Sequence, residues 1–102
     1  MEEVKKVSAT SMPLVRQVAV RLQVEPEVLE RDSLKVYLEK RLRAVEAELF
    51  FLMNRYGVNS VEELDELIQA GKYHEDETFE DYFELDYLQH QQKTLRAALE
   101  EL

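Results

Sequence analysis

The densest group of chemically active side chains lies in the stretch ETFEDYFELDYLQH, residues 77–90, which holds five acids, four aromatic residues and one histidine. Asp86 and His90 are four residues apart, so on a helix they share one face and can contact the same metal ion. A zinc site uses three or four protein ligands, whereas this pair supplies two. The Glu-x-x-His spacing of bridged metal pairs is missing, because Tyr87 stands three residues before His90. We therefore expect an exposed Asp–His pair and no metal site.

Other reaction chemistries find little support in the residue types. Paired carboxylates act as acid and base only where a pocket separates their pKa values, and here they follow one another along one short segment. The chain has no cysteine, and its four serines lie in the N-terminal segment or at expected helix starts. Its two glycines each follow an expected helix, which leaves no glycine-rich phosphate loop. We expect a protein that is not an enzyme and needs no cofactor.

Charge is distributed unevenly along a chain of 102 residues with a net charge of −9. Residues 60–88 carry eleven acids and one base, Lys72, whereas residues 1–24 carry four bases and two acids. An acidic surface repels nucleic acid and anionic lipid and attracts basic proteins. The middle of the chain is therefore expected to attract a small basic protein. The alternative is a solvated acidic face that serves solubility alone.

Composition favours long helices in one small domain. Glycine and proline number two each, and leucine, glutamate, alanine and lysine are frequent. A domain of this size has a thin core and often gains burial by self-association, so we expect a homodimer or larger. No apolar run is long enough to cross a bilayer and no signal peptide is evident, which favours the cytoplasm.

The sequence of the N-terminal quarter predicts a β-strand. Residues 1–12 lack periodicity and are expected to be a flexible lead. In residues 13–24, apolar Val18, Val20, Leu22 and Val24 alternate with other residues, the pattern of a half-buried strand. The alternative is the first turns of a helix. A lone strand must pair with another chain, so Val18, Val20 and Leu22 are expected to form a dimer ribbon.

A long helix is expected over residues 26–56. Proline suits the first helical position, which Pro26 occupies, and Gly57 is placed to end the helix. A break near Asp32 and Ser33 is the alternative, since either can cap a restart. Phe50, Phe51 and Met53 widen the apolar stripe toward a second neighbour. The stripe itself has the heptad spacing of a coiled coil and consists of Leu38, Leu42, Val45, Leu49, Leu52 and Tyr56.

Two further helices complete the expected fold. Ser60 and Glu63 have the spacing of a capping box before a short helix over residues 61–69, which Gly71 ends. Thr78 can cap a C-terminal helix over residues 79–102. The predicted fold class is mostly α: a long antiparallel helical hairpin, a short capped helix between its arms, and one N-terminal β-strand.

The apolar stripe of the last helix changes face midway along its length. Its leucines lie on one face and can pack on the long helix, whereas its aromatic residues point elsewhere. These rings are either core beneath the short helix or anchors for a partner, with nearby acids steering it. The candidate partner-binding residues are Glu62, Asp65, Glu66, Phe79, Tyr82, Phe83 and Tyr87.

The motifs LFFLMNRYGV, SVEELDELIQAG and FEDYFELDYL, followed by a leucine-rich tail, resemble small archaeal and thermophile proteins, some of them antitoxin-like partners in toxin–antitoxin modules. The resemblance covers about residues 35–102. It implies a protein without enzymatic activity that binds a small basic toxin through its acidic C-terminal part. It also implies an N-terminal dimeric DNA-binding element, in which Arg16, Arg21 and Gln23 are possible DNA contacts from a paired ribbon. A ribbon-helix-helix protein needs two separate helices after the strand, and this requires the break near Asp32.

The expected function is a cytoplasmic protein–protein interaction module, antitoxin-like or otherwise regulatory. Its working surface is expected between Glu62 and Tyr87. The alternative is a structural coiled-coil or chaperone-like scaffold without a dedicated partner.

Overall fold

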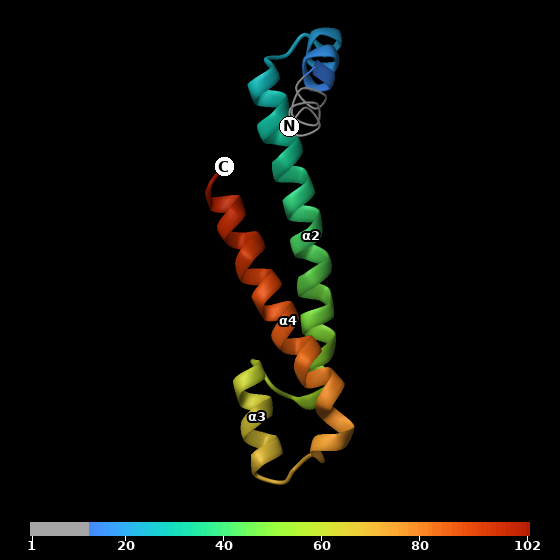
Figure 1. The fold of residues 1–102 in the computed structure, drawn as a ribbon, viewed down its shortest axis with the longest axis vertical. Coiled ribbons are helices and arrows are strands. Elements are labelled where there is room, and N and C mark those ends of the chain that lie inside the picture. The colour runs from blue at the N-terminus through green and yellow to red at the C-terminus, as the bar shows by residue number, and fades with distance from the viewer. Residues whose placement is uncertain (1–12) are drawn as a thin grey trace, which may run out of the picture. The chain divides into compact units, whose positions relative to one another are not determined.

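A computed structural model describes residues 13–102, and the flexible lead expected over residues 1–12 lies outside them (Figure 1). The described chain is mostly helical and contains no strand. A helical segment over residues 13–22 precedes α2 (Pro26–Tyr56), α3 (Val61–Gln69) and α4 (Glu75–Glu100). One helical domain was expected over residues 13–102. The chain divides into two compact units, and the boundary lies within α2, between Tyr37 and Leu38.

The strand expected over residues 13–24 is wrong, because residues 13–22 form a helix. Ala19 is fully buried in this helix, whereas Val18, Val20 and Leu22 of the expected ribbon are exposed. The same residues also fit a helix, since Val15, Val18, Ala19 and Leu22 have the spacing of one helical face. Seven residues of alternation are too few to outweigh this second pattern.

The end of this helix uses a glutamine where glycine is usual. Gln23 has φ of 59°, in the left-handed region. Its N–H donates to the carbonyl of Val20 at 3.1 Å, and the N–H of Val24 donates to the carbonyl of Ala19 at 3.0 Å. These two hydrogen bonds form a Schellman C-cap, which satisfies carbonyls that the end of a helix leaves without partners. The apolar alternation therefore runs across a helix end.

The helix α2 is continuous from Pro26 to Tyr56, so the break considered near Asp32 is absent. It starts with the N–H of Leu29 donating to the carbonyl of Glu25 at 3.0 Å. It ends at Gly57, which has φ of 66°. The N–H of Gly57 donates to the carbonyl of Asn54 and the N–H of Val58 donates to that of Met53, which forms another Schellman cap. Both bounds coincide with those expected from Pro26 and Gly57.

The short helix α3 is capped at both ends. The hydroxyl of Ser60 accepts a hydrogen bond from the N–H of Glu63 at 3.2 Å, as the capping box predicts. The Glu63 carboxylate accepts from the N–H of Asn59, one residue before the cap. The amide oxygen of Gln89 on α4 accepts from the N–H of Val61 at 2.6 Å, which ties the start of α3 to α4. Val61 and Leu64 bury the apolar face of α3.

The C-terminal helix starts earlier than expected, with His74 rather than Thr78 at its N-cap. Thr78 is buried, and its hydroxyl donates to the carbonyl of His74 at 2.9 Å. A threonine that bonds back to the residue four positions earlier lies inside a helix. The added first turn carries Asp76 and Glu77, whose charges interact favourably with the positive end of the helix dipole.

Within residues 38–102, α2 and α4 lie side by side in opposite directions (Figure 1). The Glu46 carboxylate accepts hydrogen bonds from Gln92 at 2.9 Å and Arg96 at 2.7 Å, whereas Arg55 pairs with Asp81. Positions later in α2 therefore meet positions earlier in α4, as in an antiparallel pair. The bond from Gln92 and the charge of Arg96 lower the pKa of Glu46.

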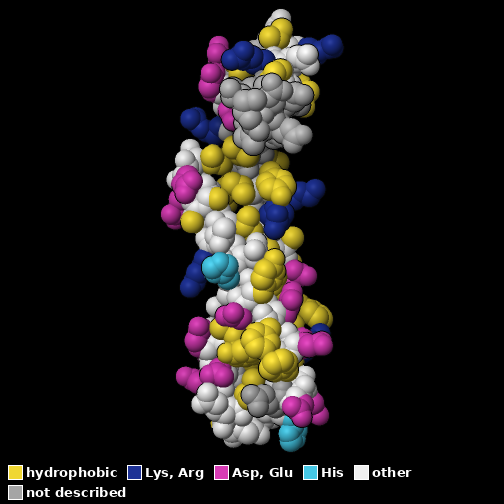
Figure 2. All heavy atoms as spheres, in the orientation of Figure 1, with side chains coloured by type: hydrophobic (Ala, Val, Ile, Leu, Met, Phe, Trp, Pro, Cys, Tyr) yellow, Lys and Arg dark blue, Asp and Glu magenta, His cyan; other side chains and the backbone are white. Residues whose placement is uncertain are grey.

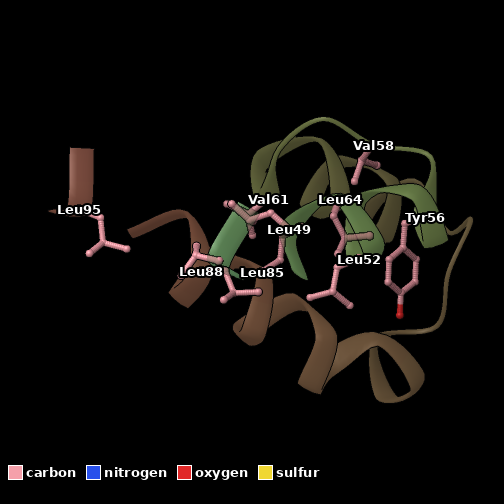
Figure 3. Packing of buried hydrophobic residues seen from close by; sticks show 10 residues of the cluster. Leu49, Leu52, Tyr56, Val58, Val61, Leu64, Leu85, Leu88 and Leu95 are labelled. Atoms are coloured by element: carbon pink, nitrogen blue, oxygen red, sulfur yellow. The ribbon is translucent and has the colours of Figure 1, made fainter. Parts of the chain in front are cut away.

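The core of this unit is formed by leucines and valines from α2, α3 and α4 (Figure 3). The predicted stripe of α2 is confirmed: its last four members are buried, and Leu38 and Leu42 pack against them. Leu49, Leu64 and Leu85, one from each helix, are the largest fully buried side chains described. The buried cluster comprises Val45, Leu49, Leu52, Tyr56, Val58, Val61, Leu64, Leu85, Leu88 and Leu95.

Candidate partner-binding surface

Three of the four predicted aromatic anchors on α4 are exposed. Phe79, Phe83 and Tyr87 are 53, 52 and 56% accessible to solvent. They follow one another at four-residue spacing, and at about 100° per residue they lie opposite Leu85 and Leu88, which face the core. The packing of α4 thus turns a row of rings away from the protein interior. Core packing explains only the fourth ring, that of Tyr82, which lies against the buried cluster.

The rings contact one another and border a hollow. The ring centroids of Phe79 and Phe83 are 4.7 Å apart and those of Tyr82 and Phe83 are 5.3 Å apart, both edge to face. Such geometry is favourable for aromatic pairs. With Asp65 and Ile68 of α3 they line a hollow of about 170 Å³. The fold thus joins predicted residues of α3 and α4 in one surface.

The carboxylate of Asp65 lines the hollow with these rings, and two further acids lie on the same helix. Glu62 and Glu66 are exposed on α3, and Asp65, half-buried, accepts a hydrogen bond from Gln69 at 3.0 Å. Figure 2 shows hydrophobic side chains gathered among acidic ones on the part of the molecule that holds α3. We call the four rings and the three α3 acids together the acidic–aromatic surface. It comprises Glu62, Asp65, Glu66, Phe79, Tyr82, Phe83 and Tyr87.

A polar group joins the end of α2 to α4, and sequence reasoning missed it. Asp81 accepts hydrogen bonds from the hydroxyl of Tyr56 and from the guanidinium of Arg55, the latter at 2.7 Å. The bond from Tyr56 and the nearby Arg55 charge lower the pKa of Asp81, whereas burial and Asp81 raise the pKa of Tyr56. A signal was present, because Asp81 stands one turn before Leu85 on the buried stripe of α4. An acid at such a position needs polar partners.

A second hollow, of about 350 Å³, lies between α2 and α4 within residues 38–102. Phe51, Leu52 and the two charged residues Glu48 and Arg55 line it from α2; Asp81, Glu84 and Leu88 line it from α4. The guanidinium of Arg55 lies over the Phe51 ring, 5.1 Å from the centroid. The expectation that Phe50 and Phe51 widen the core stripe is wrong, because they are 64 and 63% exposed. Phe51 lines this hollow, whereas Phe50 does not.

Comparison with known proteins places the chain in a family. A family model matches residues 5–102, which is nearly the whole sequence. The chain belongs to the Uncharacterized protein MJ0235 family. Neither the curated proteins nor the solved structures compared gave a match. The MJ0235 match over residues 5–102 includes the residues of both hollows and of the acidic–aromatic surface.

The predicted DNA contacts of this MJ0235-family chain lack the ribbon on which they depended. Arg16, Arg21 and Gln23 are exposed on or directly after the helix over residues 13–22. Arg16 and Arg21 are five positions apart, so at about 100° per residue they point to different sides of that helix. A ribbon-helix-helix arrangement is therefore wrong for residues 13–56, which show neither a strand nor a break in α2.

Asp86 and His90 are both exposed on α4. Across residues 13–102, no three histidine, aspartate or glutamate side chains converge in a way that could hold a metal ion. None of the helices in this described range is long and apolar enough to span a membrane.

Proposed function

We propose that this chain is a protein–protein interaction module without enzymatic activity, which binds a small basic protein through the acidic–aromatic surface. The observation that carries the proposal is the row of Phe79, Phe83 and Tyr87, each more than half exposed on the side of α4 that faces away from the core. A large aromatic side chain removes about 150–250 Å² from water when it is buried. Exposed rings in contact with one another are typical anchors of an interface.

The charge around the rings supports a basic partner. Residues 60–88 hold eleven acids and one base, and Lys72 lies near the ring of Tyr73. A surface of this sign speeds encounter with a positively charged protein and disfavours nucleic acid. An antitoxin-like regulator in the cytoplasm is the form of the proposal that the resemblance of residues 35–102 supports. DNA binding would then need contacts other than a ribbon.

Self-association is part of the proposal and would use another part of the chain. Two copies of the acidic–aromatic surface repel each other, because both are negatively charged. Residues 13–37 carry exposed apolar side chains, among them Leu14, Leu34 and Val36. Their burial in a dimer would offset the small core that a chain of this size can form.

The test is to isolate the full chain from its own host and weigh the complex by native mass spectrometry. We expect a small basic protein bound to the wild-type chain and lost from the double variant Phe83→Ala/Tyr87→Ala. The matched control is Phe50→Ala, which removes an exposed ring from α2 and should retain the partner. Circular dichroism should show the double variant folded, because neither ring is core.

Retention of the partner by Phe83→Ala/Tyr87→Ala would refute this surface as the binding site. A homo-oligomer without a second protein, combined with cooperative melting of the free chain, would favour the scaffold function. Loss of helical signal in the double variant would show that the rings are needed for folding and would remove the argument from exposure.

A further inference from the structure

The hollow between α2 and α4 combines apolar walls with two exposed carboxylates besides the paired Asp81. Phe51, Leu52 and Leu88 supply its apolar lining. Glu48 and Glu84 are exposed at its edge, and no hydrogen bond or ion pair engages either of them within the described residues. A site with this lining suits a ligand that has an apolar stem and a positively charged head.

The protein's own Arg55 shows which cation the lining accepts. Its guanidinium pairs with Asp81 at 2.7 Å while lying over the Phe51 ring. Carboxylate pairing and stacking on an aromatic face are the two contacts that a guanidinium makes better than an ammonium group. Because Arg55 neutralises Asp81, the lining keeps two negative charges, those of Glu48 and Glu84. The lining therefore has negative charge left for a second cation.

The hollow is continuous with the acidic–aromatic surface. Glu84 stands three residues before Tyr87, and side chains at this spacing are neighbours on a helix. Moving around α4, the hollow at Glu84 comes first, then Tyr87 and Phe83, and then the smaller hollow at Phe79 and Tyr82. A partner that covers the rings thus also reaches Glu84.

We propose that the hollow between α2 and α4 receives an arginine side chain of the basic partner, with Glu48 and Glu84 pairing its guanidinium and Phe51 stacking on it. This inference rests on the proposed function, because it assigns one contact of the same partner. The charge of the lining disfavours an anion, and the exposed Phe51 ring favours arginine over lysine.

The test uses the full chain labelled with ¹⁵N and a capped Gly-Arg-Gly peptide as the probe. We expect saturable NMR shifts at the amides of Glu48, Phe51 and Glu84. A Gly-citrulline-Gly peptide has the same shape without the charge and should give no such shifts. A Gly-Lys-Gly peptide should bind more weakly than the arginine peptide.

Removal of the carboxylate charges should weaken binding of the probe peptide. Glu48→Gln and Glu84→Gln should each lower the affinity for Gly-Arg-Gly by roughly 1.4-fold to fivefold, the range of exposed ion pairs. The matched control is Glu100→Gln, an exposed acid on α4 that belongs neither to the hollow nor to the acidic–aromatic surface, and it should leave the affinity unchanged. Both hollow variants should remain folded, because neither carboxylate is buried.

Three results would overturn the inference: equal binding of the citrulline peptide, shifts spread evenly over the acids of α3 and α4, or no saturable binding. The outcome of the native-partner experiment is independent of the outcome of the peptide experiment. If Gly-Arg-Gly binds at the hollow but Phe83→Ala/Tyr87→Ala keeps the native partner, the proposed function is wrong and the arginine site remains. If the double variant loses the partner while Gly-Arg-Gly does not bind, only the arginine site is wrong.

Discussion

The carboxylate of Asp81 on α4 accepts a hydrogen bond from the hydroxyl of Tyr56, the last residue of α2. The same carboxylate pairs with Arg55, so the final two residues of α2 are both held by one side chain from the other helix. The Tyr56 ring is buried and meets Tyr73 edge to face at 5.1 Å. This group links α2, α4 and the segment between α3 and α4, close to the acidic–aromatic surface.

We expect Tyr56→Phe to destabilise the protein by about 1–2 kcal/mol, since it removes a hydrogen bond to a charged group and keeps the ring in place. Urea unfolding followed by circular dichroism measures the change in free energy of unfolding. Tyr87→Phe, which removes a hydroxyl from a tyrosine that is 56% exposed, is the control. Equal stabilities of wild type and Tyr56→Phe would show that the bond to Asp81 contributes nothing.

Acid should weaken the link between α2 and α4. The hydrogen bond from Tyr56 and the guanidinium of Arg55 lower the pKa of Asp81 in the folded protein, below its ordinary value of 3.8. A lowered folded-state pKa contributes stability that is present above the unfolded-state pKa and is lost as the pH falls through the folded-state pKa. The stability advantage of wild type over Asp81→Asn should therefore be constant near neutral pH and decline below about pH 4. Unfolding free energies at several pH values measure it, and an advantage independent of pH would contradict the assignment.

The left-handed Gln23 predicts a stabilising substitution. A residue with a side chain pays about 1 kcal/mol for φ near 60°, a cost that glycine avoids. We expect Gln23→Gly to raise the free energy of unfolding of the N-terminal unit by several tenths of a kcal/mol to about 1 kcal/mol. Hydrogen exchange at the amides of Val20 and Val24 reports on this unit directly. Gly57→Ala is the opposite case and should destabilise the end of α2 by a similar amount, because its φ is 66°. Faster exchange in Gln23→Gly would contradict the C-cap.

Burial on α4 should separate two classes of large side chain. Leu85 is fully buried between the helices, so Leu85→Ala should cost about 2–5 kcal/mol. Phe79→Ala removes a half-exposed ring that contacts Phe83 and should cost about 1 kcal/mol or less. Thermal melts of the two variants measure the loss of stability in each. A similar loss in both would mean that the aromatic row is covered in the free protein.

Helix ends were the most predictable part of the fold. The starts at Pro26 and Ser60 and the ends at Gly57 and Gly71 each depend on a few neighbouring residues, and a single sequence displays such local signals. The heptad stripe of α2 was equally predictable, because the residues of a buried face recur at regular spacing along one helix. Prediction failed where two local patterns coexisted, as in residues 13–22, and where Thr78 offered a cap that the longer helix did not use.

Both the sequence and the tertiary structure were needed to determine which residues form the candidate site. Residue types alone located the acids and rings of residues 62–87. Whether Phe79, Phe83 and Tyr87 were core or surface depended on how far α4 is rotated against α2 and α3, which contacts between distant residues set. The same contacts decided that Asp81 meets Tyr56 and Arg55, and that Glu48 and Glu84 border one hollow. Local chemistry determines where helices begin and end, whereas burial and pairing depend on neighbours that are far apart in the chain.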